Sequence, residues 1–240
     1  IAGFVVEGSG PRQFLIRGIG PGLAAFGVAG VSSNPRVRLY QGASLQAEND
    51  DWHENPAAKV ELAAASGRIG AFPLTEGSAD AALLRAVAPG AYTVHVESAG
   101  IEGVALAEIY DAGGTAAPSL ANLSVRSTLE PSGGVLTAGF VIDGNSPRRV
   151  LIRAIGPGLA QFGVQGVVVD PILTVRREAV VVAENDNWIS DESSGIAAAA
   201  RAAGAFTLPV GSKDAVLLLA LPPGAYTAQM TGVTGGVGMI

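Results

Sequence analysis

The same pattern of residues occurs twice in this chain, and that repeat constrains the fold more than any other feature. The run Leu15-Ile16-Arg17-Gly18-Ile19-Gly20-Pro21-Gly22 returns 136 positions later as Leu151-Ile152-Arg153-Ala154-Ile155-Gly156-Pro157-Gly158. After a two-residue deletion the offset becomes 134, so that Pro89-Gly90-Ala91-Tyr92 matches Pro223-Gly224-Ala225-Tyr226. Similarity at a fixed offset is the mark of repeated structural units. The sequence therefore predicts two homologous domains.

Each copy is expected to consist of short strands separated by tight turns. In the second copy, runs of apolar and β-branched residues predict strands at 136–142, 149–155, 172–176, 179–184, 215–220 and 225–231. Strong strand breakers such as Gly156-Pro157-Gly158 lie between them. Short strands at this spacing favour an all-β fold of two tandem antiparallel β-sandwiches, similar to jelly rolls. Alanine-rich stretches at 57–65 and 196–203 predict one short helical insertion in each domain.

The repeat also predicts where the domains begin and end. The first β-sandwich is expected at 1–117 and the second at 134–240, joined by a segment at 118–133. That segment holds an alternating strand at 120–129. Because side chains alternate between the two faces of a strand, we expect Leu123 and Val125 to face inward.

The two copies do not have the same number of expected strands. The first copy has no counterpart of the strand at 120–129 ahead of it, and 237–240 matches only the start of the strand at 104–110. We therefore expect the two domains to share one strand, and a neighbouring copy of the chain to complete the other by strand exchange. The residues expected to join copies in a head-to-tail assembly are Leu120, Leu123, Val125, Val237 and Ile240.

Composition excludes several classes of function. The net charge is −6, whereas nucleic acids and anionic membrane surfaces bind clustered Lys and Arg. No run approaches the roughly 20 apolar residues that a membrane span needs. Cysteine is absent, which excludes disulfides and thiolate chemistry and fits an exported bacterial protein, although a cytosolic protein is compatible too. Only 15% of the residues are charged, so the surface tolerates close neighbours.

Oxygen-rich turns are the best candidates for a metal site. Calcium binds six to eight oxygen atoms from carboxylates, amides and carbonyls, and it is the one cofactor that the sequence suggests. Neither cluster has the spacing of a known calcium loop, and Asn and Asp side chains also cap their own turns, which is the alternative explanation. The candidate ligands are Asn49, Asp50, Asp51 and Asp80 in the first copy, and Asn185, Asp186, Asn187 and Asp214 in the second.

Two further motifs have a structural and a functional interpretation. The glycines around Pro21 and Pro157 resemble a phosphate cradle, but proline removes an N–H donor and no Lys-Thr pair follows, so we expect a structural turn. Trp52 and Trp188 follow the oxygen-rich turns directly and could stack on a sugar ring. The alternative is that each indole closes the end of its β-sandwich.

Charged residues within the expected strands give little support for catalysis. Arg17 and Arg153 lie among apolar neighbours, and we expect them to face solvent or to pair with a buried carboxylate such as Glu48 or Glu184. The two histidines have no counterpart in the other copy. No nucleophile elbow, metal-binding His-Glu motif or paired carboxylates occur in the sequence. The chain is therefore expected not to be an enzyme.

The motifs Ala-Gly-Phe-Val-Ile-x-Gly, Leu-Ile-Arg-Ala-Ile-Gly-Pro-Gly-Leu-Ala, Ala-Glu-Asn-Asp-x-Trp and Leu-Pro-Pro-Gly-Ala-Tyr-Thr resemble a tandem β-domain of large secreted bacterial proteins. More distantly, the acidic turn followed by Pro-Gly-Ala-Tyr-Thr is similar to pre-peptidase C-terminal jelly-roll domains. The first resemblance implies a non-enzymatic domain that occurs in multiples. The second implies a domain that accompanies secreted enzymes and binds calcium or matrix.

These observations predict a non-catalytic extracellular or cell-surface module. We expect it to assemble with copies of itself into a fibre or surface layer by exchanging strands. The alternative is an accessory domain that binds carbohydrate or matrix for a larger secreted protein. Neither nucleic acid nor a membrane is an expected partner.

Overall fold

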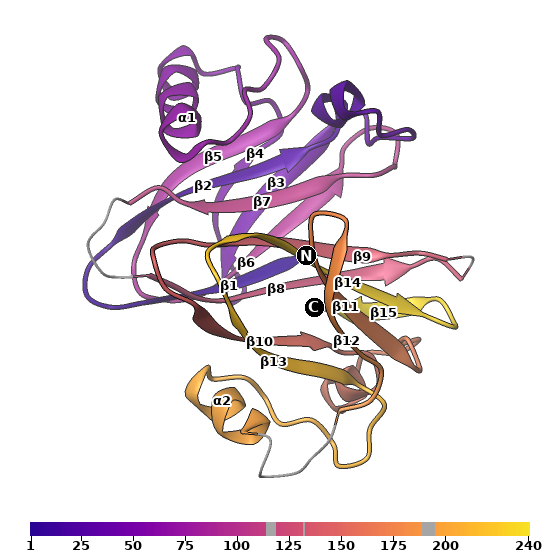
Figure 1. Cartoon of the computed structure of the whole chain (residues 1–240). Helices are drawn as coiled ribbons and strands as arrows, with labels where there is room; N and C mark the ends of the chain where they lie inside the picture. The colour runs from indigo at the N-terminus through magenta and orange to yellow at the C-terminus, as the bar shows by residue number, and fades with distance from the viewer. Residues whose placement is uncertain (114–118, 132, 189–194) are drawn as a thin grey trace. The chain divides into compact units, whose positions relative to one another are not determined.

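The computed structural model describes residues 1–113, 119–131, 133–188 and 195–240, and at 119–121 it describes the backbone alone. The chain divides into two compact units, Ile1–Leu123 (unit 1) and Ser124–Ile240 (unit 2). Both consist mainly of antiparallel strands (Figure 1). The predicted all-β fold of two tandem sandwich-like units is therefore confirmed.

Unit 1 has two sheets. The hydrogen-bonded order in the larger sheet is β8-β1-β6-β3-β4, and in the smaller it is β5-β2-β7. Its elements are β1 (Ala2–Glu7), β2 (Arg12–Ile19), the 3-10 helix η1 (Pro21–Phe26), β3 (Pro35–Gln41), β4 (Ser44–Asn49), α1 (Pro56–Ile69), β5 (Ala81–Val87), β6 (Gly90–Ser98), β7 (Leu106–Asp111) and β8 (Ser119–Leu129), of which only the first part belongs to unit 1.

Aromatic rings from both sheets form the core of unit 1. Phe4 on β1 lies 5.2 Å from Phe14 on β2 and 5.4 Å from Tyr92 on β6, measured between ring centroids. All three side chains are buried. Contacts between rings from different strands hold the two sheets face to face.

A helical insertion covers the outer face of the smaller sheet. Helix α1 begins at Pro56, after Asn55, whose side chain accepts the N–H groups of Ala57 and Ala58. It ends at Ile69 and is capped by Gly70, which has φ of 73°. These are favoured start and stop signals for a helix. Figure 1 shows α1 beside β5, where Leu62 packs in a buried cluster. Strand β2 is consequently covered on both faces.

Unit 2 repeats this plan with fewer strands in its second sheet. The order is β12-β11-β14-β9 in the larger sheet, β10 pairs with β13, and β15 pairs with the second half of β8. The elements are β9 (Leu136–Ile142), β10 (Arg148–Ala154), the 3-10 helix η2 (Pro157–Phe162), β11 (Pro171–Arg177), β12 (Val180–Asn185), α2 (Ile196–Ala202), β13 (Ala215–Leu221), β14 (Gly224–Gly232) and β15 (Gly236–Met239).

The predicted elements agree closely with the structure. All six strands expected in the second copy are present, each within one residue at either end. Both helical insertions are present as well, although α1 is longer than expected. The glycine-rich turns do more than reverse the chain, because each opens a 3-10 helix with proline at its first position.

The boundary between the two units falls inside the segment at 118–133, where we expected a strand shared by both domains. It divides β8 between Leu123 and Ser124. Leu123, expected to face inward, is 36% exposed, whereas Val125 packs against the core of unit 2. Leu123 is exposed because it precedes the part of β8 that reaches this core.

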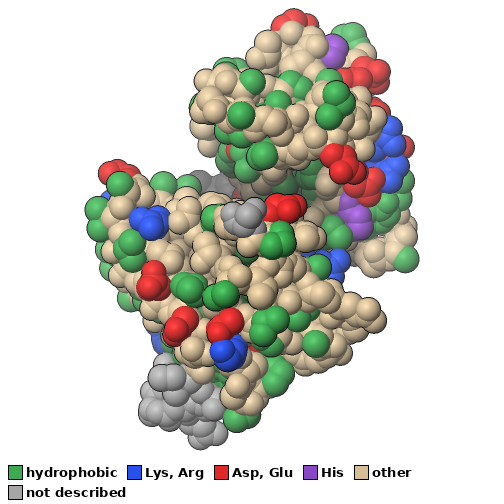
Figure 2. Space-filling model, turned by 90° about the vertical axis from the view of Figure 1, so that its right-hand side faces the viewer, with side chains coloured by type: hydrophobic (Ala, Val, Ile, Leu, Met, Phe, Trp, Pro, Cys, Tyr) green, Lys and Arg blue, Asp and Glu red, His purple; other side chains and the backbone are tan. Residues whose placement is uncertain are grey.

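The surface is poor in charge, as the composition suggests. On the face that Figure 2 shows, charged side chains lie in small scattered groups among uncharged surface. Several large apolar side chains in strands and turns are exposed, among them Val141, Val180 and Val210. In the part of the chain that the structure describes, no helix is both long and apolar enough to cross a membrane.

Candidate functional site

In unit 1 a buried aspartate holds the glycine-rich turn that follows β2. Asp80 Oδ1 accepts the backbone N–H of Gly20 at 2.9 Å and of Gly22 at 3.1 Å. Its Oδ2 accepts the Ser78 hydroxyl at 2.7 Å, and the whole residue is 0% exposed. The turn is thus an anion cradle, and the anion that fills it is a carboxylate of the chain itself.

Unit 2 contains the same arrangement. Asp214 Oδ1 accepts the N–H groups of Gly156 at 2.9 Å and Gly158 at 3.1 Å, and Oδ2 accepts the Ser212 hydroxyl at 2.6 Å. Asp214 is also 0% exposed. The sequence expectation of a structural turn agrees with these contacts, which explain why glycine and aspartate recur together in both copies.

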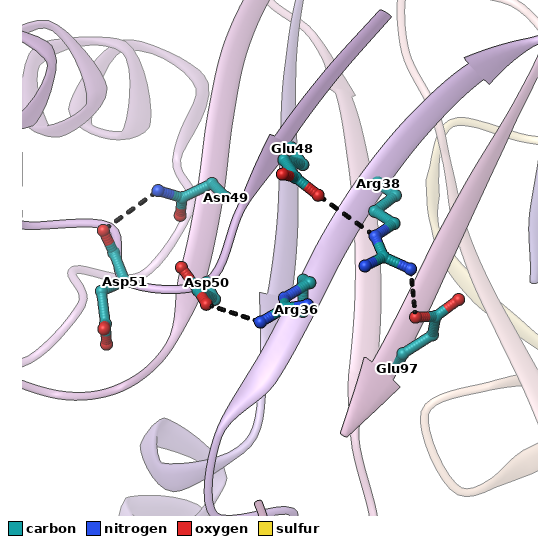
Figure 3. A network of polar contacts seen from close by, with 7 residues as sticks. All are labelled: Arg36, Arg38, Glu48, Asn49, Asp50, Asp51 and Glu97. Carbon is teal, nitrogen blue, oxygen red and sulfur yellow. Dashed lines mark hydrogen bonds and ion pairs between the residues drawn. The ribbon is translucent and has the colours of Figure 1, made fainter. Parts of the chain in front are cut away.

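The oxygen-rich turn after β4 is held by contacts within the chain (Figure 3). Asn49 Oδ1 accepts the N–H of Ala82 at 2.8 Å, and Asn49 Nδ2 donates to the carbonyl of Asp51 at 3.0 Å. Asp50 forms an ion pair with Arg36 at 3.0 Å. The asparagine therefore links the end of β4 to the start of β5.

The matching turn in unit 2 uses the same asparagine contacts. Asn185 accepts the N–H of Val216 at 2.9 Å and donates to the carbonyl of Asn187 at 3.0 Å, while Asp186 is exposed. Among the described residues, no three His, Cys, Asp or Glu side chains gather as a metal site. The structure thus brings Asp80 and Asp214 to the glycine turns and not into a shared oxygen cluster. Calcium binding stays a prediction, and the hydrogen bonds described above hold these turns without a cation.

We expect removal of divalent metal ions to leave the stability of the chain unchanged. The Asp80 and Asp214 carboxylates are already satisfied by N–H and O–H donors, so no cation is needed to neutralise or orient them. Thermal unfolding followed by circular dichroism, with excess EDTA and then with excess calcium, tests this. A rise in Tm of several degrees with calcium alone would contradict the expectation.

The indole side chains of the two tryptophans point into the interior of their own units. The Trp52 backbone N–H donates to the Asp80 carbonyl at 2.9 Å, its indole donates to Ser78 at 3.3 Å, and the side chain is buried. Trp188 makes the matching bonds and is partly buried in a cluster.

A pocket of about 250 Å³ lies beside Trp52, between α1 and β5, and Glu61 and Arg85 are among its lining residues.

Arg17 forms a buried ion pair with a carboxylate, but its partner is Glu108 and not Glu48, and it does not face solvent. It is 0% exposed, and its Nε donates to Glu108 on β7 at 2.7 Å. Its Nη1 donates to the Phe72 carbonyl at 2.6 Å, and its guanidinium carbon lies 4.4 Å from the centre of the Phe72 ring. Tyr110 completes the group by donating to Glu108 at 2.7 Å.

The environment of Tyr110 makes unit 1 sensitive to high pH. Burial, with the hydrogen bond to Glu108 as a second cause, raises the pKa of Tyr110 from 10 to about 12. The native state therefore holds the phenol proton more tightly than the unfolded state. This contribution to stability is complete below pH 10 and is lost as the pH rises toward 12.

We expect the Tyr110→Phe variant to lose less stability between pH 10 and pH 12 than the parent chain does. Denaturant unfolding at a series of pH values, followed through Trp52 in a Trp188→Phe background, measures the difference. Tyr92→Phe is the matched control. If both variants and the parent showed the same dependence on pH, the pKa of Tyr110 would not be raised by folding.

Arg153 repeats the position of Arg17 without its acidic partner. Its Nη1 donates to the Phe206 carbonyl at 2.6 Å, and its guanidinium carbon lies 4.5 Å from the centre of the Phe206 ring. Within the described residues, Arg153 forms no ion pair. Burial lowers its pKa, and the charge of Asp214 opposes that shift.

The second half of β8 and the end of the chain lie side by side in unit 2. Val125 and Ile240 exchange two backbone hydrogen bonds, at 2.7 and 2.9 Å, and both side chains pack against the unit 2 core. Val237 is paired with Thr128. Three of the five predicted assembly residues are thus together, Leu123 is exposed, and the side chain of Leu120 lies outside the described residues.

Comparison with known proteins found no match, either among family models or among curated proteins. The two histidines of unit 1 each contact a different aromatic ring. His53 is beside Trp52, with ring centroids 6.1 Å apart, and His95 on β6 packs against Tyr40 at 4.8 Å.

Proposed function

We propose that this chain is a non-catalytic structural module of an extracellular bacterial assembly, whose copies join into a fibre or surface layer by exchanging β8. The observation that carries the proposal is the unit boundary inside this strand, between Leu123 and Ser124. A strand that starts in one unit and completes the next can be supplied by another copy. The extracellular location rests on the resemblance to secreted bacterial β-domains.

The contacts of β8 with unit 2 are those of an ordinary antiparallel ladder. Residues 126–129 pair with the four residues of β15, and Val125 pairs with Ile240. Every one of these contacts forms equally well with β8 of a neighbouring copy, because sequence and register are the same. Such exchange of an identical element is a low-cost route to assembly, and it gives an open polymer when the rotation does not close.

Sedimentation velocity and negative-stain electron microscopy test the proposal. We expect oligomers whose size grows with protein concentration. Val125→Asp should abolish them, because it places a charge where β8 packs against unit 2. Val210→Asp is the matched control, since Val210 is 84% exposed. A single monomeric species at every concentration would contradict the proposal.

A second candidate function is favoured by the pocket beside Trp52. Its lining includes Asn55, Glu61 and Arg85, which are polar groups of the kind that orient a sugar, next to an indole. This would make the chain a carbohydrate- or matrix-binding module. A glycan array with the parent chain and with Arg85→Ala tests it, and a signal that is absent or equal for both would rule it out.

A further inference from the structure

The turn between β9 and β10 joins an aspartate directly to a glycine. Asp143 is the only Asp or Asn in the sequence that glycine follows. Asp143 and Gly144 are both exposed, and the Oδ1 atom of Asp143 accepts the backbone N–H of Gly144 at 2.7 Å. The side-chain carboxyl group therefore lies against the amide nitrogen of the next residue.

This contact brings together two atoms that can close a ring. Cγ of Asp143 is bonded to Oδ1, so it is at most one C–O bond length further from the Gly144 nitrogen than Oδ1 is. Reactions within a chain are fast when the reacting atoms are held about 3–3.5 Å apart. Gly144 has no side chain to shield its nitrogen, and the space beside it is open, because a Cβ atom there would meet nothing within 4 Å.

The strands on both sides hold this turn in place without including it. Ile142 is paired with Gly224 and Arg148 with Leu221, whereas residues 143–147 lie outside both strands. One more main-chain atom in the turn thus leaves the strand pairs intact, as is usual for insertions in surface loops. The folded chain can therefore accept a longer backbone link at this point.

We propose that Asp143 is a self-modification site, where the chain converts aspartate to isoaspartate without an enzyme or cofactor. The Gly144 nitrogen attacks Cγ of Asp143, so that an N–Cγ bond forms, the nitrogen gives up its proton, and one carboxyl oxygen leaves as water. Water then adds to the main-chain carbonyl carbon of Asp143 in the resulting succinimide ring and breaks its bond to the Gly144 nitrogen. The main chain now runs through Cγ, and the former carbonyl carbon carries the free carboxylate. One water leaves and one enters, so the mass is unchanged.

Unit 1 contains a natural control for this reaction. Glu7 and Gly8 occupy the equivalent positions and are exposed, and Gly8 has φ of 113° where Gly144 has φ of 94°. The longer glutamate side chain would have to close a six-membered ring, with one more rotatable bond to fix. We therefore expect Glu7 to stay unchanged. The inference concerns a covalent change within one chain and does not depend on the assembly proposed above.

Ageing of the folded chain tests the site. The parent chain, Asp143→Glu and Glu7→Asp are kept folded near neutral pH for several weeks. Tryptic peptides are then fragmented by electron transfer, which distinguishes the two linkages of equal mass. We expect isoaspartate to form at residue 143 of the parent chain at least about tenfold faster than at any other aspartate, because its reacting atoms are held together. Asp143→Glu should remove this product, and Glu7→Asp should add it at residue 7.

A free peptide and labelled water make the result decisive. A synthetic peptide of residues 139–148 is aged beside the folded chain, and both are kept in water enriched in ¹⁸O, which should place a labelled oxygen on the isoaspartate formed. Labelled isoaspartate that accumulates at residue 143 of the folded chain supports the proposal. Asp143 that stays unchanged in the folded chain overturns it, and a peptide that reacts under the same conditions would then show that the fold protects the site.

Discussion

Glu108→Ala is expected to destabilise unit 1 by about 3–5 kcal/mol, the usual cost of breaking a buried ion pair from one side. The variant leaves the Arg17 guanidinium fully buried without a carboxylate, beside the Phe72 carbonyl and the rings of Phe72 and Tyr110. Tyr110 loses its hydrogen-bond acceptor in the same step. Urea unfolding, followed through Trp52 in a Trp188→Phe background, measures the loss.

An exposed ion pair in the same unit is the matched control. Glu97 on β6 pairs with Arg38 at 2.9 Å and its side chain is 45% exposed. Exposed ion pairs contribute little to stability because water screens them, so Glu97→Ala should unfold close to the parent chain. The double variant Arg17→Met with Glu108→Ala should regain much of the loss, because no buried charge is left alone. Equal effects of Glu108→Ala and Glu97→Ala would contradict the buried ion pair.

Gly20→Ala is expected to cost about 3 kcal/mol or more, at the upper end of overpacking effects. A Cβ atom at this position would lie 2.2 Å from the carbonyl oxygen of Ser32, a backbone atom that cannot move aside alone. The same shift would disturb the Gly20 N–H bond to the buried carboxylate of Asp80. Unfolding of unit 1 through Trp52, again in a Trp188→Phe background, gives the value.

Gly67→Ala provides the contrast within unit 1. Gly67 lies inside α1 and a Cβ there would meet nothing within 4 Å, so alanine should stabilise the helix by roughly 0.5–1 kcal/mol. The two substitutions add the same methyl group with opposite expected signs. If Gly20→Ala were neutral, the close contact between the turn and Ser32 would not exist in solution.

The repeat was sufficient to predict most of the fold. Because two copies share turn signals and strand patterns at fixed offsets, the strands of the second copy were located within one residue. Alternation along β8 indicates which residues face inward, but it could not show that Leu123 and Val125 belong to different units. A strand pattern specifies which face is apolar, but not which core that face will meet.

The buried ion pair of Arg17 could not be predicted from the sequence, for a different reason. Arg17 was expected to alternate toward solvent, but α1 and the side chains beside it cover the outer face of the smaller sheet, so both faces of β2 are buried. Its partner Glu108 is 91 residues away. The bonds between the buried aspartates and the glycine turns left a signal in the sequence, since Asp80 and Asp214 recur in step with those turns.

The most direct test of the central claim is a crosslink between β8 and β15 in mixed copies. Thr128 and Val237 are opposite each other and do not exchange backbone hydrogen bonds, because Val237 bonds Gly166 and Val168 instead. Such pairs have the short Cα separation that suits a disulfide, and the chain has no cysteine of its own. The variant carrying Thr128→Cys and Val237→Cys is made with and without ¹⁵N.

The two forms are unfolded, mixed, refolded together at high concentration and oxidised. Mass spectrometry then reads the isotopic label on each half of the crosslinked peptide. Strand exchange predicts that a large share of the crosslinks joins a labelled β8 to an unlabelled β15, with both single-cysteine variants giving none. If every crosslink joined halves with the same label, β8 would complete only its own chain, and assembly through this strand would be contradicted.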